Sequence, residues 1–247
     1  MYTLAFVALS LVGVTLGLLG GGGSILTVPV LVYALNVDEK AAIASSLVVV
    51  GLTSAAALVP YARRKEVVWK IGLTFAGPGM IGAFVGGRLA AYVPSRVLLL
   101  MFAGMMVATA VVMFRGRPAV VGEVRGERPL AKIVVDGLGV GLVTGLVGAG
   151  GGFLVVPALT LLGGLPMRQA VGTSLLVIAL KSGAGYLGHA GHVNIDWNLT
   201  LLGAGAAVLG SFVGGALSQR IDQNTLRRGF ASFVLVMAAY LVYKQAS

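Results

Sequence analysis

Cysteine is absent from this chain of 247 residues, which excludes disulfide bonds, thiolate metal ligands and cysteine nucleophiles. Charge is also scarce, because 11% of the residues are charged, whereas a soluble domain carries about 25%. Hydrophobic residues make up 57% of the chain. This balance excludes an ordinary soluble domain and predicts an all-α integral membrane protein embedded in the lipid bilayer.

Acidic residues are the scarcer charges, so the net charge is +10. A basic chain can bind nucleic acid, but here the basic residues lie in short loops between apolar stretches, where they orient a membrane protein. We therefore expect no nucleic-acid partner. Glycine, by contrast, is abundant at 38 residues, which suits close packing of helices in lipid.

One sequence pattern occurs twice in the chain. Residues 17–31 read GLLGGGGSILTVPVL and residues 145–159 read GLVGAGGGFLVVPAL, an offset of 128 residues that also pairs Trp69 with Trp197. A period this long indicates a duplicated half, and duplicated halves are typical of secondary transporters. We expect a first transmembrane repeat at 1–114, a cytoplasmic linker at 115–130 and a second repeat at 131–247.

Each half contains three apolar stretches of about 20 residues, the length that crosses a bilayer as a helix. Both halves open with a pattern that differs from these long stretches. It consists of an apolar stretch of normal length, a glycine run and a second apolar stretch that is too short to cross. Because glycine runs favour non-helical backbone, each opening predicts a helical hairpin bent at the glycines. The long stretches are 41–60, 70–92, 97–114, 168–188, 198–219 and 226–243, and the openings are 2–19 with 25–35 and 131–147 with 153–163.

Residues 2–19 resemble the apolar core of a signal peptide. They lack a basic start and a small-residue cleavage site, and the repeat maps them onto residues 130–147 deep inside the chain. Both features are unlike a cleaved signal. We therefore expect this stretch to belong to the fold.

Basic loops predict the orientation of the chain in the membrane. The basic loop at 63–65 should be cytoplasmic, and its repeat counterpart at 189–196, which has no lysine or arginine, should lie outside. The arginines at 220–228 place another loop inside. Equivalent loops then lie on opposite sides, which predicts two inverted repeats, each a glycine-broken hairpin plus three transmembrane helices. We expect a multi-pass protein of the cell inner membrane.

The glycine breaks predict a binding site for an anion. A helix start presents free N–H groups and a partial positive charge, and the short helices should begin near 24–25 and 152–153. Inverted repeats would bring both starts to one pocket near mid-membrane. The alternative is that the glycines only permit tight helix crossing. The candidate residues are Gly21, Gly22, Gly23, Ser24, Gly150, Gly151 and Gly152.

Hydroxyl side chains recur early in the next helix of each half. Ser45 and Ser46 match Thr173 and Ser174 at the repeat offset. A hydroxyl there can donate to a bound oxyanion, but it can equally cap a helix or bond back to a carbonyl. We include all four as candidates for substrate binding.

Lys181 breaks the repeat, because its counterpart is Thr53. An ionisable residue inside a predicted span is a functional candidate by default, and a lysine there can neutralise an anion. The alternative is a lysine that snorkels to the membrane surface. No carboxylate stands out within a predicted span, so an acidic proton carrier is not evident.

The two histidines of the chain, His189 and His192, lie near a predicted loop with only Asp196 to help as a ligand. This is weak support for a metal site, so we expect a solvated loop, no metal and no cofactor. Trp69 and Trp197 begin equivalent helices and fit the aromatic belt of a membrane protein.

The two glycine motifs, each followed by a similar segment at 42–47 and 170–175 (AIASSL and AVGTSL), resemble those of the TauE/SafE family of sulfite exporters. The resemblance covers nearly the whole chain. It implies transport of sulfite, sulfoacetate or another sulfur-containing or organic anion across the bacterial inner membrane. The first motif carries Ser24 where the second has Gly152, so the two half-sites need not be equivalent.

The sequence therefore predicts a secondary transporter for a small anion, working by alternating access, and not an enzyme. Two alternatives stay open at this point: an anion channel of the same fold, and a membrane assembly protein without transport activity. The sequence also leaves open proton coupling, a homodimer, the identity of the anion and the direction of transport.

Overall fold

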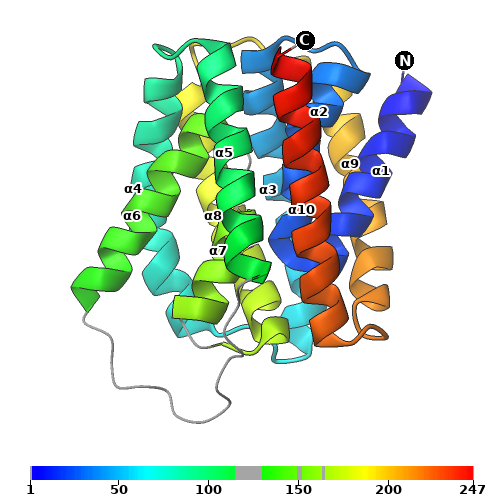
Figure 1. Cartoon of the computed structure of the whole chain (residues 1–247), viewed down its shortest axis with the longest axis vertical. Helices are drawn as coiled ribbons and strands as arrows, with labels where there is room; N and C mark the ends of the chain where they lie inside the picture. The colour runs from blue at the N-terminus through cyan, green and yellow to red at the C-terminus, as the bar shows by residue number, and fades with distance from the viewer. Residues whose placement is uncertain (1, 115–129, 149–151, 163–164, 247) are drawn as a thin grey trace.

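The computed structural model describes residues 2–114, 130–148, 152–162 and 165–246. Within these ranges the regular structure is helical and includes no strand (Figure 1). The prediction of an all-α chain is therefore confirmed. Most of the predicted linker, 115–129, lies outside the described residues, as do Gly150 and Gly151.

The elements follow the repeat. The first half comprises α1 (Tyr2–Leu19), the 3₁₀ turn η1 (Gly20–Gly23), α2 (Ser24–Pro29) with its π-helical continuation η2 (Val30–Ala34), α3 (Glu39–Arg63), α4 (Trp69–Ala90) and α5 (Ser95–Phe114). The second half comprises α6 (Leu130–Val147), α7 (Gly152–Pro157) with its π-helical continuation η3 (Ala158–Leu162), α8 (Met167–His189), α9 (Trp197–Leu217) and α10 (Gln223–Ala246).

All six long apolar stretches are helices. Within the described residues, three helices are long and apolar enough to cross a membrane by length and composition: α3, α8 and α9. Shorter apolar helical runs lie in α1, α2 with η2, α5 and α6. The pieces after the glycines, α2 with η2 and α7 with η3, are too short to cross a membrane as ordinary helices, as expected.

Glycines bring the two halves into backbone contact. A Cβ added at Gly13 of α1 would overlap the backbone oxygen of Ala207 in α9, and one at Gly141 of α6 would overlap that of Gly79 in α4. These two contacts are equivalent under the 128-residue offset. The opening helix of each half, α1 or α6, thus packs against the second long helix of the other half, α9 or α4.

The bundle has two ends that can be named by their residues. Tyr61, near the end of α3, bonds Ser218 just after α9 through their hydroxyls at 3.0 Å, so α9 ends where α4 begins. We call this the arginine end, because Arg63 and Arg64 lie there. The other end, with the end of α4 and residues 189–196, is the histidine end.

The opening helices run in opposite directions. Gly13 and Gly17 of α1 lie against Ala207 and Ser211 of α9, so α1 is parallel to α9 and runs from the histidine end to the arginine end. Figure 1 shows the N-terminus at the same end of the bundle as the C-terminus of α10. In the second half, Gly141 and Gly145 of α6 lie against Gly79 and Ala83 of α4. The helix α6 is therefore parallel to α4 and runs from the arginine end to the histidine end.

Each short helix returns beside the opening helices. Leu31 and Leu35, in and just after η2, pack in one apolar cluster with Ala5 and Leu9 at the start of α1. The chain therefore goes in through α1, turns at the glycines and comes back to the histidine end. In the second half, Val155 packs with Phe75 near the start of α4, so that return leads to the arginine end.

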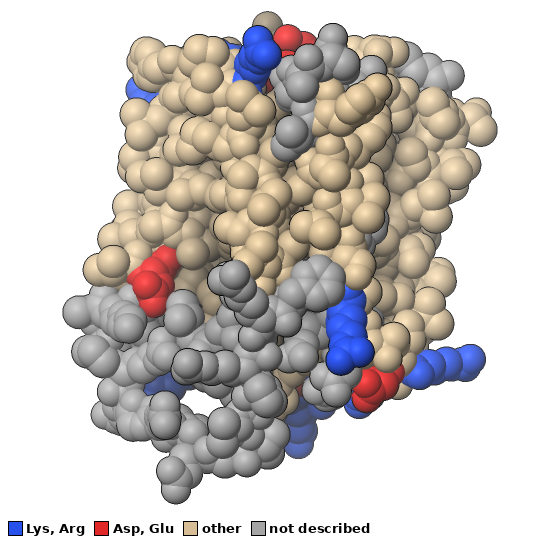
Figure 2. All heavy atoms as spheres, in the orientation of Figure 1, with Lys and Arg blue, Asp and Glu red and all other residues tan. Residues whose placement is uncertain are grey.

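An apolar belt surrounds the bundle. Large hydrophobic side chains on the outer helix faces are 60–66% exposed: Leu11, Ile81, Leu187, Val135, Leu209, Val213 and Val236. Figure 2 shows an uncharged band between the charged ends on the face in view. Trp69 and Trp197, the first residues of α4 and α9, are each 49% exposed and stand at opposite ends. Outer faces of this kind are suited to lipid.

Candidate functional site

The two glycine turns begin with the same backbone conformation. Gly20 has φ 68° and Gly148 has φ 74°, a left-handed conformation that glycine adopts without the steric cost of a Cβ. The turns are equivalent under the repeat. After them, α2 begins at Ser24 and α7 at Gly152, where the sequence predicted the short helices to begin.

Each glycine turn is held by the other half of the molecule. A Cβ at Gly148 would overlap Ile43 of α3, and the Ser46 hydroxyl hydrogen bonds to the Gly148 carbonyl. A Cβ at Gly20 would lie 3.1 Å from the Ser174 Oγ of α8. Ser46 and Ser174 are repeat equivalents, so each half supplies the same serine to the glycine turn of the other half. Both candidate serines therefore lie at the turns.

The two openings also meet in the interior. The turn η1 packs against α7, and α2 packs against α7. Gly23 and Ser24 are buried. The parts of the two glycine breaks that the structure describes therefore touch each other away from the outer surface. The positions of Gly150 and Gly151 in this arrangement lie outside the described residues.

Ser45 and Thr173 have a different environment. The Thr173 hydroxyl oxygen accepts the backbone N–H of Val68 at 3.0 Å, directly before α4. The Ser45 hydroxyl oxygen accepts from the Thr200 hydroxyl at 3.2 Å, in the first turn of α9. Both contacts tie the start of a neighbouring helix, at opposite ends of the bundle. This favours the capping interpretation of these two hydroxyls.

Lys181 is buried in the middle of α8. Its side chain is 1% exposed, and its Nζ has no hydrogen-bond partner within the described residues. A Cβ added at Gly79 of α4 would lie 2.9 Å from the Lys181 Cδ, so the glycine leaves room for the lysine stem. Snorkelling to the surface is thereby excluded as the explanation for this residue.

The equivalent position in the first half is filled differently. Thr53 is buried too, and its hydroxyl donates to the Val49 carbonyl in its own helix at 2.7 Å. Ala207 occupies the position equivalent to Gly79. The pair formed by Lys181 and Gly79 is therefore replaced as a whole, by Thr53 and Ala207, at the equivalent place.

A buried ammonium group without a partner is costly, by several kcal/mol after the protein relaxes. An anion that binds beside the Lys181 Nζ would offset this cost. Lys181 lies one helical turn from Val177, which packs with Val155 of α7 in an apolar cluster. The charge therefore lies on the face of α8 that packs toward the second glycine-broken hairpin.

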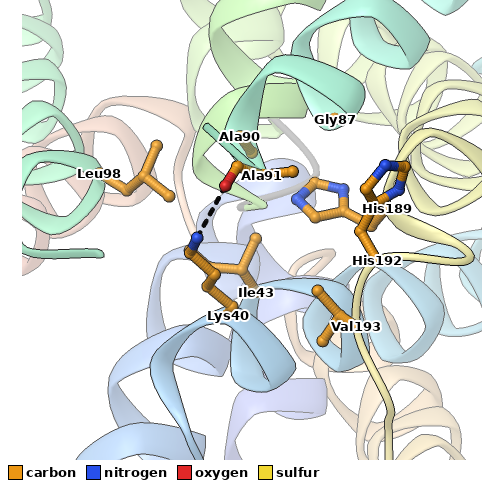
Figure 3. A pocket seen from close by; sticks show the side chains of 9 residues that line it. All are labelled: Lys40, Ile43, Gly87, Ala90, Ala91, Leu98, His189, His192 and Val193. Atoms are coloured by element: carbon orange, nitrogen blue, oxygen red, sulfur yellow. Dashed lines mark hydrogen bonds between the residues drawn. The ribbon is translucent and has the colours of Figure 1, made fainter. Parts of the chain in front are cut away.

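A pocket opens at the histidine end. It is small and partly open to solvent, and it is lined by Lys40, Ile43, Gly87, Ala90, Ala91, Leu98, His189, His192 and Val193 (Figure 3). We call it the histidine pocket. His189 is 3% exposed and its Nδ1 bonds the Gly185 carbonyl at 3.0 Å. The prediction of a solvated loop for His189 is wrong, because α8 continues through it and α4 packs over it.

A second pocket opens at the arginine end. It is also small and partly open to solvent, and it is lined by Tyr61, Glu66, Arg168, Val171, Ser218, Gln219 and Ile221. We call it the arginine pocket. The Tyr61 hydroxyl bonds both the Gly17 carbonyl and the Ser218 hydroxyl at 3.0 Å. Its floor thus reaches the backbone of α1 just before the first glycine turn.

Sequence reasoning missed both pockets. The repeat offset contained a signal for them, because Lys40 and Arg168 are 128 residues apart and both are basic. It also missed Asp136, a half-buried carboxylate in α6 that lies inside the predicted stretch 131–147. Among the described residues, no three histidine, aspartate or glutamate side chains gather as a metal site would require.

Comparison with known proteins agrees with this architecture. The family model for sulfite exporter TauE/SafE matches residues 5–241. A probable membrane transporter protein of Xylella fastidiosa (strain 9a5c) is 33% identical over 95% of this chain and 92% of its own length. The probable membrane transporter protein YunE of Bacillus subtilis (strain 168) is 29% identical over 96% of both chains. No solved structure gives a significant match.

The match therefore spans α1 to α10, including both glycine turns and Lys181, and the relatives are named as membrane transporters. Together with the apolar belt, this identifies a membrane protein with a transport role. The chain belongs to the TauE/SafE sulfite exporter family.

Proposed function

We propose that this protein is a secondary transporter that moves a small sulfur-containing oxyanion, such as sulfite, across the bacterial inner membrane. The observation that carries the proposal is the buried Lys181 ammonium, which has no partner within the described residues. An anionic substrate supplies the opposite charge, and a neutral or cationic substrate does not. The family membership supports transport, and Lys181 supports the charge of the substrate.

Alternating access between two inverted halves, 1–114 and 131–247, is the proposed mechanism. Its support is the opposite direction of α1 and α6 and the repeat-equivalent contacts of their glycines with α9 and α4. Because each glycine turn is held by the other half, a rocking of one half against the other would move both turns together. This is the kind of motion that inverted-repeat transporters use.

The proposed substrate site lies between the glycine breaks and Lys181. The helical run Ser24–Ala34 begins in the interior, where the positive end of a helix dipole favours an anion. Gly21, Gly22, Gly23, Gly150, Gly151 and Gly152 would let the anion approach the backbone. Ser46 and Ser174 lie at the turns and would donate to the anion in place of the backbone carbonyls that they bond in this structure, whereas Ser45 and Thr173 support the neighbouring helices.

The proposed orientation places the arginine end in the cytoplasm. Arg63, Arg64 and Lys65 are exposed there, and Arg168 and Arg220 are exposed at the same end. Cytoplasmic loops carry an excess of lysine and arginine. Both termini of the first repeat's opening hairpin would then face the outside, and the chain would cross the membrane several times.

The test is flux through purified protein in liposomes, with labelled sulfite, sulfoacetate and sulfate offered separately. The proposal expects saturable uptake of at least one of them, accelerated by unlabelled anion on the opposite side. No protein-dependent flux of any of the three would contradict it. Flux that neither saturates nor shows exchange would instead indicate an anion channel.

A further inference from the structure

The histidine pocket and the arginine pocket are equivalent places in the two halves. Lys40 Nζ donates to the Ala91 carbonyl at 2.9 Å, and Arg168 Nη2 donates to the Gln219 carbonyl at 3.4 Å. Both donors and both acceptors are separated by 128 residues. Each pocket therefore has one cation that bonds the backbone at the end of α4 or α9.

Each pocket also leads to a glycine turn. Ile43 lines the histidine pocket and packs against Gly148. Its counterpart Val171 lines the arginine pocket and packs against Gly20, with 3.0 Å between its Cγ1 and a Cβ added there. A single apolar residue thus separates the empty space of each pocket from the turn that the other half supplies.

The wall of the histidine pocket holds a polar atom that is not engaged. His189 is buried, its Nδ1 is occupied by the Gly185 carbonyl, and its Nε2 has no partner within the described residues. Figure 3 shows His189 and His192 on one wall, with Lys40 and its bond to Ala91 across from them. In the part of the chain that the structure describes, neither glutamate nor aspartate contributes to the lining.

We propose that the histidine pocket is a binding vestibule for a small oxyanion, held by Lys40 before it passes Ile43 toward the turn at Gly148. Lys40 bonds a neutral carbonyl, and an oxyanion is a stronger acceptor because its hydrogen bond with the ammonium joins opposite charges. The incoming anion therefore replaces Ala91 as the partner of Lys40. The proposal rests on the anionic substrate proposed above.

The arginine pocket is the corresponding vestibule at the other end, with a weaker hold on the anion. Arg168 is the cation there, but Glu66 lines the same pocket, and its Oε2 has no partner within the described residues. A carboxylate repels an anion that approaches Arg168. The two vestibules thus differ in affinity, with the histidine pocket as the tighter one.

The test uses the absence of cysteine, which makes a single introduced thiol unambiguous. Val193→Cys places a thiol in the lining of the histidine pocket, and Ile221→Cys places one in the arginine pocket. Labelling of each thiol by a methanethiosulfonate reagent is timed with and without sulfoacetate, a sulfonate that does not attack the reagent. We expect sulfoacetate to slow labelling of the Val193→Cys protein, and to do so at lower concentration than for the Ile221→Cys protein.

Lys40→Gln in the Val193→Cys background should raise the sulfoacetate concentration needed for protection by about tenfold or more, the usual value of a hydrogen bond to a charged group. Lys40→Arg should restore much of the protection. Lys70→Gln is the matched control, because Lys70 is exposed at the start of α4 at the other end and lines neither pocket; it should change nothing.

Labelling of the Val193→Cys protein that sulfoacetate does not slow would overturn the vestibule, as would protection that survives Lys40→Gln. Flux of the Val193→Cys protein separates this result from the proposed function. Protection without flux would support the vestibule and contradict the proposed transport. Flux without protection would support transport and contradict the vestibule.

Discussion

The two halves of this protein match closely where they pack and differ where they carry charge. Gly17 meets the backbone of Ser211, and its counterpart Gly145 meets the backbone of Ala83 in the same way. In the middle of the bundle, however, Lys181 of the second half lies beside Gly79 of the first half, and the equivalent pair is Thr53 of the first half and Ala207 of the second half. The helix contacts are thus alike in the two halves, whereas the second half alone has the buried lysine and the first half has the glycine that leaves room for it.

The two pockets show the same division. Their cation-to-carbonyl bonds, from Lys40 and from Arg168, are equivalent. Their walls differ, because His189 faces one pocket where Tyr61 and Glu66 face the other. A symmetrical scaffold with unequal entrances suits a transporter that treats its two sides differently.

The largest effect is expected at the equivalent helix contacts in which a glycine lies directly against the backbone of the other half. Gly17→Ala and Gly145→Ala would each drive a Cβ into a backbone carbonyl of the other half. Overpacking typically costs about 1–3 kcal/mol and occasionally more, so both variants should lose thermal stability in detergent by similar amounts.

The matched controls for these variants are also a repeat pair. Cβ atoms added at Gly77 and Gly205 would meet nothing within 4 Å. Gly77→Ala and Gly205→Ala should therefore leave the melting temperature nearly unchanged. If only one of Gly17→Ala and Gly145→Ala were destabilising, the equivalence of the two interfaces would be refuted.

The next effect concerns the position where the halves differ. Lys181→Met removes the charge and keeps the side-chain length, and it should lower anion flux by about 10–100-fold, the value of a hydrogen bond to a charged group. Because replacing an uncompensated buried charge by an apolar group is often neutral or stabilising, the variant should unfold no earlier than the wild type.

Thr53→Val is the control at the equivalent position, since it removes only a hydroxyl that bonds its own helix. It should retain wild-type flux. A Lys181→Met protein that loses stability and flux together would point to a structural lysine instead of one that binds the anion.

The smallest difference is expected between the two serines at the turns. Both hydroxyls bond the carbonyl three residues earlier in their own helix at 2.7 Å, but only Ser46 also bonds a carbonyl of the other half, at Gly148. Ser46→Ala should therefore lower the free energy of unfolding by about 1 kcal/mol more than Ser174→Ala. Equal losses in chemical denaturation would mean that the bond between the halves contributes nothing.

The sequence was sufficient to predict the long helices, the bends at the glycines and the starts of the short helices at Ser24 and Gly152, because hydropathy and glycine runs are local signals. It also identified Lys181, because the repeat exposes the mismatch with Thr53. It did not identify the pockets, since each combines residues from at least three separate segments. In the sequence, Lys40 is a basic residue near a helix start. Only the fold brings the Ala91 carbonyl beside its ammonium group.

The burial of His189 could not be predicted from the sequence either. Its neighbours in the chain are small residues that favour a turn, Gly188, Ala190 and Gly191. Its burial arises from Gly87 of α4, whose added Cβ would lie 2.8 Å from the His189 Nδ1. Contacts of this kind between distant glycines and side chains depend on the register of two helices. Hydropathy carries no information about that register.

An experimental structure with bound selenite, the selenium counterpart of sulfite, would locate the anion by its anomalous signal. We predict a peak within hydrogen-bond distance of the Lys181 Nζ, between α4, α8 and the second glycine-broken hairpin. We also predict that Lys181→Met abolishes this peak. Selenite peaks confined to the surface, from a protein whose sulfite flux selenite inhibits, would contradict a substrate site at Lys181.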